Sequence, residues 1–266
     1  MEHSALDVFW FSLAYPVSLV LAVLIGYGVA EVNYRRRHRT WKPSGIESAL
    51  ITIYGLLLSF TLLSSNNALK ERTTLIHQSS EAIVELYQES QLLPEATHVM
   101  VRAFLLKFLA LELAQHSPGK PHNSAHLRNI EALDFQAWRY FRGSVRGASP
   151  QAAELRQLLP AFHKLHVATS RLHYSYQERT PSPITMLLLV SSWAIGILVG
   201  FTNSAQETRH YFVPILFVVI SVLTVQAIRD LDNPELGFIR PNYSNLRDLE
   251  RALSNAASTD RKLLHQ

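Results

Sequence analysis

The sequence predicts an all-α membrane protein with four transmembrane helices and a helical extramembrane domain inserted between the second and the third. The first reason is that Lys, Arg, Asp and Glu are absent from four windows, each near the ~20 residues that span a bilayer core: Val8 to Ala30, Ser48 to Leu69, Thr180 to Gln206 and His210 to Ile228. The second reason is that charges are frequent between the second and third windows, as in a domain exposed to water. The mean hydropathy of +0.06 therefore averages two different environments.

These observations divide the chain into four parts. Residues 1–69 hold the first two transmembrane helices, residues 70–179 the helical domain, residues 180–228 the third and fourth transmembrane helices, and residues 229–266 a turn followed by a short helix. Nothing in the inserted domain shows the alternation of apolar and polar residues that is typical of a strand.

The first window is predicted to remain as a transmembrane helix rather than to be a cleaved signal peptide. It is long, has no basic segment before it, and is followed by arginines instead of a small-residue cleavage site: Arg35, Arg36, Arg37 and Arg39. Pro16 inside this window is a candidate position for a kink.

One helix is expected to leave the membrane and continue outside it without a break. After the second charge-free window, Leu69, Ile76 and Ile83 recur every seven residues among charged side chains. This pattern indicates an amphipathic helix in water. The helix is expected to end at about Leu92, because Pro94 stands where a new helix would begin.

Three further helices are expected in the domain and one in the tail. Their apolar residues recur at helical intervals: Val101, Phe104, Leu105, Phe108 and Leu111 in the first, Leu127, Ile130, Trp138 and Phe141 in the second, and Leu155, Leu158, Leu159, Phe162, Leu165 and Leu172 in the third. Ser124 is the predicted N-cap of the second helix, and Pro150 begins the third, which is expected to bend at Pro160. The tail helix is expected to be capped near Asn242 or Ser244.

The third transmembrane helix contains a pair of glycines. The segment PSP, from Pro181 to Pro183, begins this helix, and Gly196 and Gly200 within it form a GxxxG pair. Such a pair favours close contact with another helix. Two glycines without any special role are an equally good interpretation.

No catalytic, metal or cofactor site is expected. The sequence has no P-loop, GxSxG, HExxH or dinucleotide-binding motif, and it has no cysteine to act as a nucleophile, a thiolate ligand or half of a disulfide. His163, His166 and His173 lie near one another, but they lack a carboxylate at metal-like spacing and are interpreted as solvated surface residues. The pI near 9.4 comes largely from a basic cluster beside a membrane window, so nucleic acid is not an expected partner.

Two stretches of the chain resemble a known family. GLLLSFTLLSSNNALKERTTLI, from Gly55, and DLDNPELGFIRP, from Asp230, are similar to the bestrophin-like family of bacterial membrane proteins, as is the plan of four spans around a helical insert. More distantly, NNALKERT from Asn66 and LDNPELG from Leu231 resemble two motifs of bestrophin ion channels, NNASYDRW and a DPFG-like segment. The paired tryptophans and the dense acidic run that binds calcium in animal bestrophins are missing here, so calcium gating is not among the expectations.

The resemblance to bestrophins implies a homopentamer whose second transmembrane helices surround a central pore for small inorganic ions. Four spans in one subunit are too few to enclose a hydrated pathway, so a ring of subunits is also expected on physical grounds. Counting from Arg72 as the motif arginine, the apolar neck of the pore falls on Leu56, Phe60 and Ser64, where rings of Leu and Phe can gate by dewetting. The alternative is that Leu56 and Phe60 pack against neighbouring spans.

Two further groups of residues receive expected roles. Asn66 and Asn67 are expected to line a vestibule at the membrane edge, with ordinary capping or interfacial solvation as the alternative. Arg72 is expected to pair with Asp230 or Asp232, because the second and fourth spans cross in the same direction and end at the same membrane face. Separate solvated charges are the alternative for this pair.

The expected location is a bacterial inner membrane, with the lipid bilayer as a partner. The first loop, from Arg35 to Lys42, is basic, whereas Met1 to Asp7 carries no Lys or Arg, which places the N-terminus outside the cell. The helical domain and the tail are then periplasmic. The bestrophin analogy would place both in the cytoplasm, and the charge distribution is the criterion favoured here.

The sequence therefore predicts an oligomeric, bestrophin-like ion channel without enzymatic activity, which passes small ions through a pore lined by the second span. The alternative is a non-conducting membrane scaffold or sensory protein whose helical domain binds partners. The two differ in whether polar substitutions in the second span change permeability.

Overall fold

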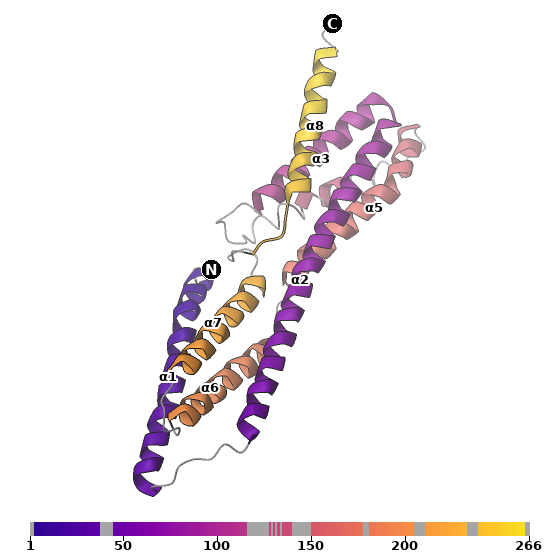
Figure 1. The fold of residues 1–266 in the computed structure, drawn as a ribbon. Helices are drawn as coiled ribbons and strands as arrows, with labels where there is room; N and C mark the ends of the chain where they lie inside the picture. Colours follow the sequence, from indigo (N-terminus) through magenta and orange to yellow (C-terminus); the bar gives the residue numbers. More distant parts are fainter. Residues whose placement is uncertain are drawn as a thin grey trace. The chain divides into compact units, whose positions relative to one another are not determined.

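Most of the residues that the structure describes are in helices (Figure 1). This computed structural model describes residues 3–37, 45–115, 150–177, 181–204, 211–232 and 239–263, with residues 128, 130, 132, 133 and 135–139 between them. In chain order the helices are α1 (His3–Arg37), α2 (Ile46–Gln91), α3 (Glu95–Gln115), α5 (Pro150–Gln177), α6 (Ser182–Ser204), α7 (Phe212–Asp232) and α8 (Ser244–Leu263). No strand occurs among the described residues, so the predicted all-α class is confirmed.

The chain forms two compact units. The first, called the spanning unit here, contains Met1–Ala68 and Arg179–Ile239. The second, called the helical unit, contains Leu69–Glu178 and Arg240–Gln266. Helix α2 therefore contributes to both units, and the tail that was expected as one part is divided between them. The placement of the helical unit outside the membrane stays a prediction.

Four helices are long and apolar enough to cross a membrane, as the charge-free windows predict. The candidate spans are Leu13–Arg35 in α1, Ile46–Gln91 in α2, Pro183–Ser204 in α6 and Phe212–Asp232 in α7. The length and composition of these helices are those of a multi-pass membrane protein.

Glycines bring the backbones of α1 and α6 into direct contact. A Cβ atom at Gly26 would lie 2.1 Å from the carbonyl oxygen of Ile197, and one at Gly200 would lie 2.1 Å from the carbonyl oxygen of Val23. At Gly196 the nearest atom would be a leucine side-chain carbon at 3.2 Å. The GxxxG pair therefore marks a close helix contact, and Gly200 is its tighter member.

Side-chain hydrogen bonds add to the contact between α1 and α6. The indole Nε1 of Trp193 donates to the hydroxyl of Ser18 at 3.0 Å, and the side-chain amide of Asn203 donates to the hydroxyl of Tyr27. Such bonds between membrane helices fix the register of one helix against the other.

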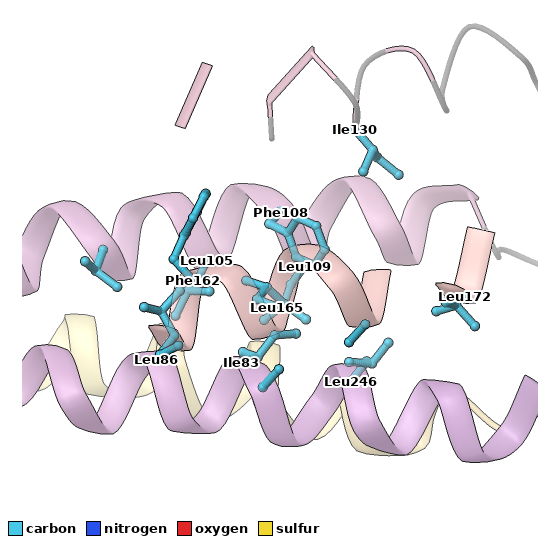
Figure 2. Packing of buried hydrophobic residues seen from close by; sticks show 14 of the residues in the cluster. Ile83, Leu86, Leu105, Phe108, Leu109, Ile130, Phe162, Leu165, Leu172 and Leu246 are labelled. Carbon is cyan, nitrogen blue, oxygen red and sulfur yellow. The ribbon is translucent and has the colours of Figure 1, made fainter. Parts of the chain in front are cut away.

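The helical unit has an apolar core to which α2, α3, α5 and α8 contribute (Figure 2). Ile76 and Ile83 of α2 are fully buried, as the seven-residue repeat predicts. Fully buried side chains of the other helices belong to the same core, and Figure 2 labels them together with Ile83: Leu105 and Leu109 of α3, Leu165 and Leu172 of α5, and Leu246 of α8. Ile130, from the expected second domain helix, also belongs to this core, while Ser124, Leu127 and Phe141 lie outside the described residues.

The ends of the helices agree with the proline signals. Helix α2 ends at Gln91, one residue before the predicted Leu92, and α3 begins directly after Pro94. Helix α5 begins at Pro150 and continues past Pro160 without interruption. Proline fits the first turn of a helix because the amide proton that it lacks has no partner there.

The tail helix α8 is fixed to the helical unit by polar contacts as well as by its apolar face. The side-chain oxygen of Asn242 accepts a hydrogen bond from the backbone N–H of Ser244 at 2.8 Å, which confirms the expected start of this helix. The side-chain nitrogen of Asn245 lies 2.8 Å from Nδ1 of His77 on α2. Residues 233–238 of the predicted turn before α8 lie outside the described residues.

Candidate pore-lining face of α2

Within the spanning unit, α2 has a buried face and an outward face. The buried face carries three hydroxyl side chains and one leucine at helical spacing: Tyr54, Leu58, Thr61 and Ser65. The outward face is apolar, and each of its side chains is at least 54% exposed: Ile53, Leu56, Phe60 and Leu63. Three hydroxyl side chains of this segment are therefore turned into the spanning unit, while four of its large apolar side chains are turned away from it.

The three predicted neck residues lie on or beside the outward face. Leu56 is 55% exposed and Phe60 is 62% exposed, and Ser64 is exposed as well. Leu56 and Phe60 are therefore not covered by the other described helices of their own chain. What they face in an assembly stays a prediction.

The predicted neck residues are spaced four apart, and this spacing does not keep side chains on one face of a helix. Alternating steps of three and four residues do. Each step of four turns a helix by about 40°, so Leu56, Phe60 and Ser64 drift progressively to one side. Ile53 and Leu63 also lie on the outward face, one before Leu56 and one after Phe60. Sequence reasoning missed both of them. The signal that identifies them is the alternation of three and four residues from Ile53 to Leu63.

The two predicted vestibule residues differ in exposure. Asn67 is exposed, and by helical periodicity it follows Phe60 and Leu63 along the outward side of α2. Asn66 is half-buried and points to another side of the helix. Asn67 extends the outward face and Asn66 is turned about 100° from it, and the role of both residues in a vestibule stays a prediction.

Arg72 is buried in the helical unit, where it joins α2 to the end of α5. Only 2% of this arginine is exposed. Its Nε donates a hydrogen bond to the carbonyl oxygen of Ser175 at 3.1 Å, and its guanidinium lies 5.7 Å from the ring centroid of Tyr176. A cation is favourable at this place because the carbonyl groups at the C-terminus of a helix carry partial negative charge.

Tyr176 also contacts the tail of the chain. Its hydroxyl forms a hydrogen bond with the hydroxyl of Tyr243, which directly precedes α8. Asp230 and Asp232, the expected partners of Arg72, lie at the end of α7 in the spanning unit, where Asp230 accepts a hydrogen bond from the backbone N–H of Ile239 at 2.8 Å. The ion pair of Arg72 with either aspartate therefore stays a prediction. Sequence reasoning missed Ser175 and Tyr176, since their contacts depend on the fold.

The histidines of α5 differ from one another. His163 and His166 are exposed and lie against the ring of Trp138. His173 is mostly buried, and its Nε2 lies 3.2 Å from a carboxylate oxygen of Glu112 on α3. The interpretation of His173 as a solvated surface residue is therefore wrong, because a carboxylate 61 positions away in the sequence reaches it. Among the described residues no group of three His, Asp or Glu is placed to hold a metal ion.

A second ion pair connects α2 to α5 on the surface of the helical unit. The ammonium group of Lys164 donates to the carboxylate of Glu85, and this hydrogen bond raises the pKa of Lys164. Both side chains are substantially exposed, so the pair contributes little to stability.

The chain has the fold of bacterial bestrophin homologues. Three solved structures of variants of such a homologue from Klebsiella pneumoniae superpose with TM-scores of 0.66, 0.65 and 0.67. The matches cover 92%, 90% and 93% of this chain and 98%, 97% and 97% of the other, at sequence identities of 16%, 17% and 14%. No protein-family model and no curated protein matches the sequence. At these identities the similarity establishes the fold alone.

Proposed function

We propose that the chain assembles into a homo-oligomer that conducts small inorganic ions through a central pore lined by α2. Leu56, Phe60 and Ser64 form the neck of this pore, and Asn66 and Asn67 line its vestibule. The observation that carries the proposal is the outward apolar face of α2, which the other described helices of the subunit leave uncovered.

The interior of the spanning unit supports the need for several subunits. Its core is filled by large side chains, among them Tyr15, Leu19, Tyr54 and Leu58. A hydrated pathway is therefore better formed between copies of the chain than within one copy. A ring of α2 helices would place the outward faces around a common axis, where apolar rings control conduction by excluding water.

The shared fold supports the same arrangement. The similar solved structures are bestrophin homologues, and the family resemblance of the sequence implies a pentamer with the second span around the pore. A membrane channel also agrees with the multi-pass plan of the chain. The expected location is a bacterial inner membrane.

Recording from purified protein in planar bilayers tests the proposal. Replacing Phe60 with Ala removes bulk from the neck and is expected to raise conductance or open probability, while Phe60→Asp adds a ring of negative charge and is expected to favour cations. Leu223 on α7 is a matched control, because it is 61% exposed and Phe60 is 62% exposed. Leu223→Asp is expected to leave ion selectivity unchanged in the fraction that assembles.

A second control separates lining from packing. Leu58 lies on the buried face of the same helix, so Leu58→Ala is expected to weaken the subunit without changing selectivity. An unchanged current from correctly assembled Phe60→Asp protein contradicts the pore assignment. The absence of current from assembled wild-type protein favours a non-conducting scaffold whose helical unit binds partners.

We also propose that the helical unit and the tail lie in the periplasm, from the basic segment after the first span. Reporter enzymes fused after Gln266 test this orientation. Some reporter enzymes are active only in the cytoplasm. Activity of such a reporter fused after Gln266 would reverse the assignment.

A further inference from the structure

A groove of about 400 Å³ lies between α2 and α5 on the helical unit. Apolar side chains of α5 line part of it: Pro160, Val167 and Ala168. Helix α2 contributes the exposed residues Gln78 and Glu81. Pockets of this volume commonly hold small molecules, which bind through a few polar groups beside an apolar surface.

Two contacts establish how α2 and α5 run along the groove. Lys164 of α5 donates a hydrogen bond to Glu85 of α2, and Arg72 of α2 donates one to the carbonyl oxygen of Ser175 on α5. Higher-numbered residues of α2 thus meet lower-numbered residues of α5. The two helices are therefore antiparallel on either side of the groove.

Gln78 and Arg171 line the groove at one level, away from the ion pair of Lys164 with Glu85. Gln78 precedes Glu85 by seven residues, and Arg171 follows Lys164 by seven. Because the helices are antiparallel, these equal steps lead in the same direction, and each covers about 10 Å. Glu81 lies between Gln78 and Glu85 on α2, so both carboxylates are on the ion-pair side of Gln78.

The three basic residues that line the groove differ in their partners. Lys164 is bonded to the carboxylate of Glu85, and the ring of His163 lies against that of Trp138. Arg171 is exposed and has no hydrogen bond, ion pair or ring contact with any residue that the structure describes. Its guanidinium is therefore the cation of the groove that remains available to a ligand.

An anion is the favoured ligand of such an arginine. Its five N–H donors form a planar fork that matches the oxygens of a carboxylate or a phosphate. The side-chain amide of Gln78, at the same level, offers a further donor. Val167 and Ala168 precede Arg171 by about one helical turn, so an apolar group attached to the anion would lie against them.

We propose that this groove binds a small organic anion with an apolar body, whose head is held by Arg171 and Gln78 and whose body lies against Val167 and Ala168. The ligand class is an alkyl or aryl carboxylate or phosphate. The site goes beyond the proposed function and does not depend on ion conduction.

Fluorine NMR of the full-length protein in nanodiscs of zwitterionic lipid tests the site, with trifluoromethylbenzoate as the probe and empty nanodiscs as the baseline. The benzoate is expected to show saturable line broadening. The corresponding benzamide lacks the charge and is expected to bind at least about tenfold more weakly, because hydrogen bonds to charged groups are the stronger ones. Nanodiscs with added anionic lipid distinguish the two sources of such a ligand, since a lipid head group would displace the probe and a free solute leaves its affinity unchanged.

Substitutions in the groove assign the head and the body of the ligand. Arg171→Gln is expected to lower the affinity for the benzoate about tenfold, and Arg171→Lys to restore only part of it, because an ammonium group cannot form the fork. Glu81→Gln removes a nearby negative charge and is expected to raise the affinity. Val167→Trp fills the groove and is expected to abolish binding. Lys107→Gln is the matched control, because it removes one exposed positive charge from α3, outside the groove.

Three results would overturn the inference. The first is the absence of saturable broadening by the wild-type protein, and the second is an equal affinity of Arg171→Gln and Lys107→Gln. The third is tighter binding of trifluoromethylbenzylamine than of the benzoate, which would show that Glu81 and not Arg171 determines what the groove accepts. Arg171 and Lys107 are exposed, so their substitutions leave the core intact. Binding is measured without current, so its failure is distinct from a failure of the proposed conduction.

Discussion

The contact between α1 and α6 offers a sharp test of the fold, because it depends on the absence of single methyl groups. We expect Gly26→Ala to destabilise the spanning unit. The new Cβ would lie 2.1 Å from the carbonyl oxygen of Ile197 and 2.8 Å from the backbone nitrogen of Phe201. Both are backbone atoms, so neither can swing aside as the end of a flexible side chain can.

The size of the effect follows from these distances. Ordinary contacts of a Cβ atom begin at 3.4 Å, so the two helices must separate or slide by roughly 1 Å to admit the methyl group. Overpacking of this kind typically costs about 1–3 kcal/mol. The separation also disturbs the hydrogen bonds of Trp193 with Ser18 and of Tyr27 with Asn203, which join the same two helices.

Thermal unfolding in detergent, followed by circular dichroism and by recovery of a monodisperse peak, measures the change. A loss of this size lowers the midpoint by roughly 3 to 10 °C for a chain of this length. Gly28→Ala in the same helix is the control, since a Cβ there meets no atom within 4 Å. Its midpoint is expected to stay or to rise, because alanine favours helix by about 1 kcal/mol over glycine. Equal midpoints for Gly26→Ala and Gly28→Ala would refute the close contact of α1 and α6.

Three further predictions concern the helical unit, and each has its own measurement. Arg72→Lys keeps the charge but removes the Nε donor, so the free energy of unfolding is expected to fall by about 1.5–3 kcal/mol in denaturant titrations; a fall equal to that of an exposed Arg→Lys change would contradict it. Glu112→Ala removes one partner of a buried hydrogen bond and is expected to lose about 1–3 kcal/mol, and a double-mutant cycle with His173→Ala should show coupling; simple additivity would speak against the pair. Tyr243→Phe is expected to loosen α8, seen as faster proteolysis from the tail, whereas an unchanged rate would show that its hydroxyl does not hold the helix.

The continuity of α2 could be predicted from the sequence because the signals were local. After Gly55, the charge-free window passes into the repeat of Leu69, Ile76 and Ile83 without a further glycine or a proline, so nothing in that stretch interrupts the helix. The first breaker is Pro94, and the helix ends at Gln91. The apolar period predicted the buried side of its second half for the same reason, since burial in water follows the hydrophobic effect.

Contacts between distant segments could not be predicted in this way. Glu112 and His173 belong to different helices, and their pairing depends on how α3 and α5 pack in the core. The sequence offered Gly196 and Gly200 as one side of a close contact or as two glycines without a special role, and it gave no sign of the partner surface around Val23. A pattern within one helix shows that a face is suited to a contact, and only the fold selects the opposing residues.

The outward face of α2 shows a limit that is specific to membranes. In water, the apolar side of Ile53, Leu56, Phe60 and Leu63 would be predicted as the core, and in the spanning unit it is the exposed side instead. Lipid, a neighbouring subunit and an apolar pore neck all accept such a face, so hydrophobicity does not distinguish among them.

Arg72 shows how topology constrains a contact without specifying it. Counting spans places the ends of the second and fourth helices at one membrane face, and this reasoning motivated a pair with Asp230 or Asp232. It does not consider the backbone, although a buried guanidinium needs partners and an arginine offers five N–H donors. In the structure the carbonyl of Ser175 and the ring of Tyr176 receive it. An aspartate would therefore add to these contacts rather than replace them. Substituting both Asp230 and Asp232 with asparagine is expected to lower the free energy of unfolding by less than Arg72→Lys does.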